Sequence, residues 1–202
     1  MRYPAAETAE KHERILQAAS RLFRERGFSG VSVAEIMKAT GLTHGPFYNH
    51  FASKEALMAE SLELAMRASF EDLGAVPGTA QGKAEYIQRY LSTRHRDTPG
   101  KGCSMASLAT EVCREPAVRA PFTRQLKALV DKTASHLPWR SKRHAREESI
   151  RAISSMVGAL VLARAVDDDA FSEEILKAMQ HGLLEPAPKP QTASKSPSPT
   201  HQ

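Results

Sequence analysis

The sequence has few cysteines and no long apolar segment. Its 202 residues include two cysteines, Cys103 and Cys113, which are too few to build a disulfide framework or to fill a four-ligand zinc site. No stretch approaches the roughly 18 consecutive apolar residues that a transmembrane helix needs. Residues 1–8 also lack the apolar core of a secretory signal. We therefore expect a cytoplasmic chain that does not enter a membrane.

Several patterns that mark enzymes are also missing. The chain contains no glycine-rich phosphate loop, no HExxH pair and no recognisable grouping of nucleophile, base and acid. We therefore expect no catalytic residues, no cofactor and no metal site. The composition is that of a globular protein, with 41% hydrophobic and 25% charged residues. The formal net charge of +5 favours an anionic partner but does not establish one.

Apolar residues recur at helical spacing, and alternating β-branched runs between hairpin turns are absent. This pattern predicts an all-α fold. Beyond residue 75 we expect helices near residues 80–94, 102–113, 117–136, 145–166 and 172–184. The prolines among the polar residues of 186–202 predict a disordered tail, because such a composition buries too little apolar area to become ordered.

The first two helices have clear boundary signals. An apolar stripe from Ile15 to Phe23 follows the 3.6-residue period and is ended by Gly27. Ser32 is followed three residues later by Glu35, which predicts a capping box at the start of a second helix.

Two further helices follow in the N-terminal region. The second helix ends at Gly41, and Thr43 can cap a short third helix that carries Pro46 in its first turn, where a missing amide matters little. Ser53 caps the next helix, which runs to Gly74.

Two short helices joined by Thr40-Gly41-Leu42 match the spacing of a helix-turn-helix motif, in which the second helix enters the major groove. The motif is flanked by Arg14-Ile15-Leu16, Gly27-Phe28 and the segment Phe47-Tyr48-Asn49-His50-Phe51-Ala52-Ser53-Lys54-Glu55. Over residues 10–58 the chain resembles the N-terminal DNA-binding domain of the TetR family of bacterial transcriptional regulators. The resemblance implies a helix-turn-helix domain at residues 8–52 and a helical domain for effector binding and dimerisation at residues 53–185.

Several polar residues are candidates for contacts with double-stranded DNA. If Leu42, Phe47 and Phe51 pack inward, the outward positions are Thr43, His44, Gly45, Asn49 and His50. Small and hydrogen-bonding side chains at such positions suit base edges. The resemblance implies base contacts for His44, Gly45 and Asn49, and phosphate contacts for Ser32, Tyr48, His50 and Lys54. Two alternatives stay open, because Tyr48 could be a core aromatic residue and Asn49 could be merely solvated.

The last two helices carry more apolar surface than a monomer core needs. The candidate interface residues are Ile153, Val157, Leu160, Val161, Ile175 and Met179. Small residues between them, such as Gly158, allow close helix packing. The resemblance implies a homodimer joined by a four-helix bundle from these helices. The alternative is that both apolar stripes pack inside one protomer.

The middle of the chain is expected to hold a pocket for a small-molecule effector. The candidates are the large residues of this region: Phe70, Tyr86, Tyr90, Met105, Leu108 and Phe122. Each of them could instead belong to the core. Cys103 follows Lys101-Gly102 at a helix start, where a thiol gains thiolate character. It is therefore a candidate sensor of electrophiles or oxidants, and the alternative is a structural cysteine.

These expectations combine into one function. They describe a nucleoid-associated repressor that binds a palindromic operator and leaves it when a small molecule or an electrophile binds. The alternative is an architectural or cell-division DNA-binding factor of the same fold that has no effector.

Overall fold

The computed structural model describes residues 5–43 and 45–185, and every regular element within them is a helix. His44 and the predicted tail at 186–202 lie outside the described residues. The α-helices are α1 (Ala5–Arg26), α2 (Val33–Ala39), α3 (Lys54–Gly74), α4 (Ala80–Tyr90), α5 (Thr93–Asp97), α6 (Ser104–Val112), α7 (Pro116–His136), α8 (Ala145–Ala165) and α9 (Asp169–Leu184). The 3-10 helices are η1 (Gly45–Asn49), η2 (Pro99–Lys101) and η3 (Lys142–His144). The prediction of an all-α fold is confirmed.

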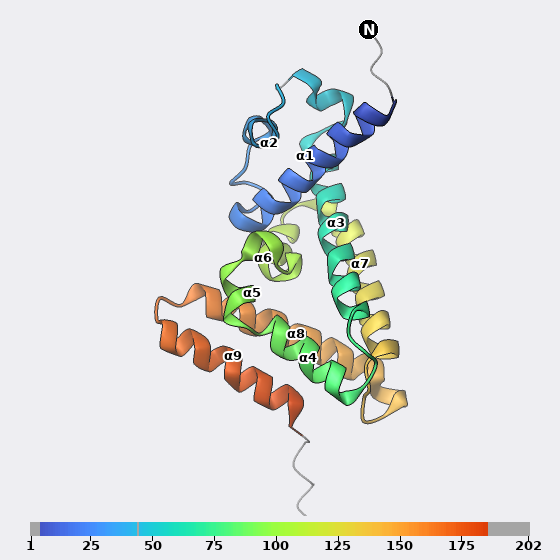
Figure 1. Ribbon diagram of the computed structural model, residues 1–202, viewed down its shortest axis with the longest axis vertical. Coiled ribbons are helices and arrows are strands. Elements are labelled where there is room, and N and C mark those ends of the chain that lie inside the picture. The colour runs from blue at the N-terminus through green and yellow to red at the C-terminus, as the bar shows by residue number, and fades with distance from the viewer. Residues whose placement is uncertain (1–4, 44, 186–202) are drawn as a thin grey trace, which may run out of the picture.

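A small head formed by α1, α2 and η1 lies at one end of the molecule (Figure 1). The boundary signals read from the sequence are confirmed there. Gly27 ends α1 with a φ of 77°, which is the left-handed region that glycine tolerates. Ser32 and Glu35 form both bonds of the capping box, and Gly41 turns the chain after α2 with a φ of 71°.

The third helix of the head differs from the α-helix expected. Residues Gly45–Asn49 form a 3-10 helix, which the His50 amide closes on the Phe47 carbonyl at 2.9 Å. A five-residue segment containing Pro46 has few amides with which to build an α-helical ladder, so the tighter turn is the natural form.

An aromatic cluster holds this short element in place. Phe47 and Phe51 are 0% and 2% exposed, and their rings stack with centroids 5.8 Å apart. Phe23 and Phe28 pack edge to face at 5.2 Å. The apolar side of η1 is therefore fixed to the head, as the sequence predicts.

Helices α3 to α9 form the second part of the molecule. The long helices α3 and α7 run side by side below the head, and α8 packs against α7 and α9 (Figure 1). The segment predicted as one helix at 80–94 is divided, because Ser92 caps the separate helix α5. Helix α9 begins earlier than predicted, because the Asp168 side chain accepts the Phe171 amide. Within 5–43 and 45–185, no helix is both long and apolar enough to span a bilayer.

The two parts are joined by polar contacts as well as by α3. The Arg24 guanidinium of α1 donates two hydrogen bonds to the Gly100 carbonyl, at 2.6 and 3.0 Å. The Glu111 carboxylate of α6 accepts the amides of Phe28 at 2.7 Å and Ser29 at 3.3 Å. The domain boundary at residues 52 and 53 stays a prediction, since α3 packs against α1 as well as α7.

Candidate functional site

The outer surface of the head presents the polar residues that follow α2. Tyr48 is 67% exposed, and Thr43 and Asn49 are also exposed. The core alternative for Tyr48 is therefore wrong, although its ring touches Phe47 edge to face at 5.1 Å. Gly45 lies in η1. The arrangement leaves hydrogen-bonding groups on a short element that is anchored from behind.

His50 is half-buried at the end of this surface. Its ring lies 6.1 Å from the ring of His12, which itself stacks on Phe51 at 4.4 Å. Burial lowers the pKa of His50, and the neighbouring His12 and Lys11 lower it further. His50 therefore favours the neutral form, in which it offers one ring N–H rather than a charge.

The two other phosphate candidates already have partners inside the head. The Lys54 ammonium donates to the Phe28 carbonyl at 2.7 Å, so it ties the start of α3 to the loop after α1. The Ser32 hydroxyl donates to the Glu35 carboxylate at 2.8 Å and accepts the Glu35 amide at 3.2 Å. An ammonium has three N–H groups, so Lys54 retains donors for an anion, whereas the Ser32 hydroxyl has used its only proton.

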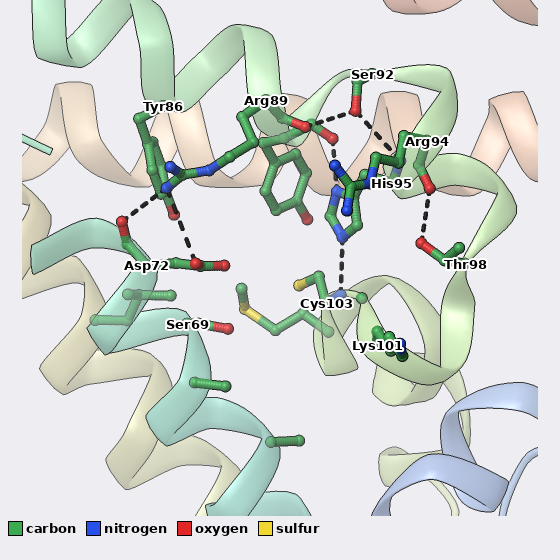
Figure 2. A pocket seen from close by; sticks show the side chains of 16 residues that line it. Ser69, Asp72, Tyr86, Arg89, Ser92, Arg94, His95, Thr98, Lys101 and Cys103 are labelled. Carbon is green, nitrogen blue, oxygen red and sulfur yellow. Dashed lines mark hydrogen bonds and ion pairs between the residues drawn. The ribbon is translucent and has the colours of Figure 1, made fainter. Parts of the chain in front are cut away.

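A cavity of about 400 Å³ lies below the head, between α3, α4 and the start of α6 (Figure 2). Of the predicted effector residues, Tyr86, Tyr90, Met105 and Cys103 line it. Phe70, Leu108 and Phe122 do not line this cavity. Leu108 is 2% exposed inside the core, and the two phenylalanines pack against that core.

Much of the polar lining was missed from the sequence. It comprises Ser69, Asp72, Arg89, Ser92, Arg94, His95, Thr98 and Lys101. One signal was available, because Ala65, Ser69 and Asp72 follow each other at helical spacing on α3. The residues of α5 and η2 carry no comparable periodic signal.

His95 organises the wall of the cavity. Its Nε2 accepts the Cys103 amide at 2.9 Å, so the ring proton sits on Nδ1, which donates to the Tyr90 carbonyl at 2.6 Å. Arg164 of α8 donates to the carbonyls of His95 and Arg96, both at 2.9 Å. Burial lowers the pKa of His95, which favours this neutral tautomer.

The two cysteines differ in access. Cys103 is the N-cap residue of α6 but is only 5% exposed, so a reagent must reach it through the cavity that it lines. Cys113 lies at the C-cap of α6 and is exposed, with its Sγ 3.4 Å from the Ala109 carbonyl. Access therefore favours Cys113 over the candidate sensor Cys103.

Two of the predicted interface residues lie inside the protomer. Ile153 and Leu160 are 6% and 0% exposed, on a helix that packs against α7 and α9. Val157, Ile175 and Met179 are half-buried, with one side packed against the core. Val161 is exposed, and so are Ile150, Leu162 and Phe171, to which the sequence pattern did not point.

These features define a class, namely an all-helical protein with a helix-turn-helix head above a larger group of helices. Residues 15–61 match the bacterial regulatory proteins of the tetR family. The chain is 32% identical over 90 residues to the uncharacterized HTH-type transcriptional regulator YerO of Bacillus subtilis (strain 168), covering 44% of this chain and 31% of YerO. It is 28% identical over 109 residues to the HTH-type transcriptional repressor NemR of Escherichia coli (strain K12), covering 52% of this chain and 55% of NemR.

The matched segments thus span about a third to a half of the length of these relatives. The fold is matched more widely. The crystal structure of reduced E. coli NemR superposes with a TM-score of 0.72 at 20% identity, covering 86% of this chain and 95% of that structure. These matches support a transcriptional regulator of the TetR type, and the match to the family itself covers residues 15–61.

Proposed function

We propose that the protein is a homodimeric repressor that binds a palindromic operator in double-stranded DNA and is released from it by a small-molecule effector. The observation that carries this proposal is the exposed polar surface of Thr43, Tyr48 and Asn49 on an element anchored by buried Phe47 and Phe51. Rigid presentation of hydrogen-bonding groups is what reading base edges and positioning on phosphates require. The proposal that the protein represses transcription rests on its similarity to NemR, which is named as a transcriptional repressor.

In this proposal Asn49, Thr43, His44 and Gly45 approach the bases, while Tyr48, His50 and Lys54 bind phosphates. Ser32 has a smaller part than expected, because its hydroxyl proton is used in the capping box. Two heads in a symmetric dimer would meet major grooves about 34–36 Å apart or a multiple of that distance. This symmetry predicts an inverted repeat in the DNA site.

The cavity favours an effector-controlled regulator over the architectural alternative. Cavities of about 300–1,000 Å³ are typical of small-molecule sites, and this one has a volume of about 400 Å³. Its wall is connected to the head, since the Gly100 carbonyl that holds Arg24 precedes the lining residues Lys101, Gly102 and Cys103. Electrophile release through Cys103 would require the reagent to enter this cavity first.

The test begins with selection of binding sites from a pool of random duplexes, which should yield an inverted repeat. Affinity is then measured against salt for Lys54→Gln and for Lys132→Gln, an exposed lysine on α7. Loss of one phosphate contact should reduce the slope of log affinity against log salt by about one for Lys54→Gln and by nothing for Lys132→Gln.

Tyr48→Ala should weaken binding to selected and scrambled duplexes alike, whereas Asn49→Ala should reduce the preference between them. Thermal unfolding of each variant separates these effects from the loss of the bond between Lys54 and Phe28. Failure to enrich any sequence, or an unchanged salt slope for Lys54→Gln together with unchanged affinity for Tyr48→Ala, would contradict the proposed DNA surface.

A further inference from the structure

The rim of the cavity is cationic. Arg89, Arg94 and Lys101 line it, and Asp72 is the single carboxylate among its lining residues within the described chain. Arg89 is occupied by Asp72, since its Nη2 donates to the Asp72 carbonyl at 2.8 Å and lies 4.0 Å from the carboxylate. The Asp72 carboxylate points into the cavity beside the Arg89 guanidinium (Figure 2). The negative charge of Asp72 is therefore neutralised by the positive charge of Arg89.

Arg94 and Lys101 remain on the other side of the rim. Both are exposed, and their side chains have no hydrogen-bond or ion-pair partner among residues 5–43 and 45–185. Unpaired cations at the mouth of a cavity attract anions and disfavour cationic ligands.

The interior is apolar and aromatic. Tyr86, Met105 and Leu129 are 7%, 6% and 1% exposed, and they line the cavity with Ala65 and Tyr90. Aromatic and thioether side chains pack well against a flat ring. A ligand with an apolar planar body therefore fits the interior, and an anionic group fits the rim.

Tyr90 adds a polar requirement to this interior. Its hydroxyl is buried beside the Cys103 thiol, a weak acceptor, and makes no hydrogen bond of normal geometry among the described residues. The Tyr90 ring lies edge to face against His95 at 4.7 Å. Burial is the first of the causes that raise the pKa of Tyr90 well above its usual value, so the hydroxyl keeps its proton and can donate. A buried hydroxyl without a partner is unfavourable until an acceptor reaches it.

We propose that the cavity binds a small aromatic carboxylate whose acid group pairs with Arg94 and Lys101 and whose ring carries an oxygen that accepts from the Tyr90 hydroxyl. This inference rests on the proposed function, because it names the chemical class of the effector. It requires no covalent step and no metal.

The experiment is calorimetric titration of the full-length protein, without DNA, with 4-hydroxybenzoate, benzoate and 4-hydroxybenzamide. The first two share a carboxylate, and the first and third share the ring oxygen. We expect 4-hydroxybenzoate to bind most tightly. We expect the double variant Arg94→Gln/Lys101→Gln to weaken both acids by about fivefold or more and to leave the amide unchanged. Lys127→Gln, an exposed lysine on α7 outside the cavity, is the matched control.

Tyr90→Phe tests the ring oxygen separately. It should weaken 4-hydroxybenzoate by about fivefold or more and leave benzoate unchanged, because only the former offers an acceptor to the lost hydroxyl. If Tyr90→Phe does not fold, the exposed pair Arg94 and Lys101 still decides the anion requirement. Equal binding of the amide and the acid, or no binding of either acid, would overturn the proposal.

The outcomes separate this inference from the proposed function. A protein that selects an inverted repeat but binds no aromatic carboxylate leaves the repressor proposal standing and removes the ligand class. A protein that binds 4-hydroxybenzoate through Arg94 and Lys101 but enriches no DNA sequence removes the repressor proposal and keeps the ligand site.

Discussion

The proposed dimer surface gives the sharpest mutational prediction, and this prediction centres on Leu162. This side chain is 58% exposed on α8, where it follows exposed Val161, and Phe171 near the start of α9 is exposed as well. Large apolar side chains at a protein surface mark an interaction face. We expect Leu162→Glu to dissociate the dimer while each protomer stays folded.

The expected loss of dimer stability follows from the exposed fraction of Leu162. Full burial of a leucine contributes about 1.5–3 kcal/mol, so a side chain that is 58% exposed in the protomer has about 1–1.5 kcal/mol left for a partner. A twofold interface contains each substitution twice, which gives about 2–3 kcal/mol, or a 30- to 150-fold weaker dimer for Leu162→Ala. Leu162→Glu should exceed this, because each copy would also bury a carboxylate without a counter-charge.

Sedimentation across a range of protein concentrations measures the dissociation constant, and circular dichroism checks that the helices remain. Ala128→Glu on α7 is the matched control, since Ala128 is exposed outside this face. Leu160→Glu cannot serve as the test, because Leu160 is 0% exposed and a charge there would unfold the protomer itself. A Leu162→Glu dimer as tight as the wild type would refute the assignment of this face.

Three further predictions concern other parts of the molecule. Arg24→Met removes both hydrogen bonds to Gly100 and should lower the free energy of unfolding by about 1–3 kcal/mol. It should also reduce the effect of 4-hydroxybenzoate on operator affinity, which DNA titrations with and without this ligand measure. Cys113 should be alkylated faster than Cys103 in the folded protein because it is exposed, which mass spectrometry after timed labelling can check. Hydrogen bonds from Ser32 and Arg26 lower the pKa of Glu35 to about 2, so the stabilisation relative to Glu35→Gln should be present at neutral pH and lost as the pH falls from about 4.5 towards 2 in thermal unfolding.

The head could be predicted from sequence because its signals are local. The capping box of Ser32 and Glu35 and the glycine after α1 depend on residues within one turn of each other. The 3-10 form of Gly45–Asn49 was missed, because a short segment carries too few periodic positions to separate it from an α-helix.

The second domain could be predicted in outline only. Periodicity shows that α8 has apolar positions on several sides, but it does not say which side meets α7 and α9. Leu160 and Leu162 are two residues apart in sequence and differ from 0% to 58% in exposure. For the same reason Leu108 was predicted as a pocket residue. His95 was not predicted, because its position depends on tertiary hydrogen bonds to Tyr90 and Cys103.

The connection between cavity and head could not be predicted at all, since it joins residues 76 positions apart. A ligand changes DNA affinity only if it binds two arrangements of the protein differently, so some element must contact both the ligand site and the head. The loop at 98–103 does so, because Gly100 is bound to Arg24 while Lys101 and Cys103 line the cavity. A Cβ at Gly100 would lie 2.3 Å from the Glu25 carboxylate of α1. The loop therefore lies directly against α1, and we expect a displacement of the cavity wall at Lys101 and Cys103 to reach that helix through the contact between Arg24 and Gly100.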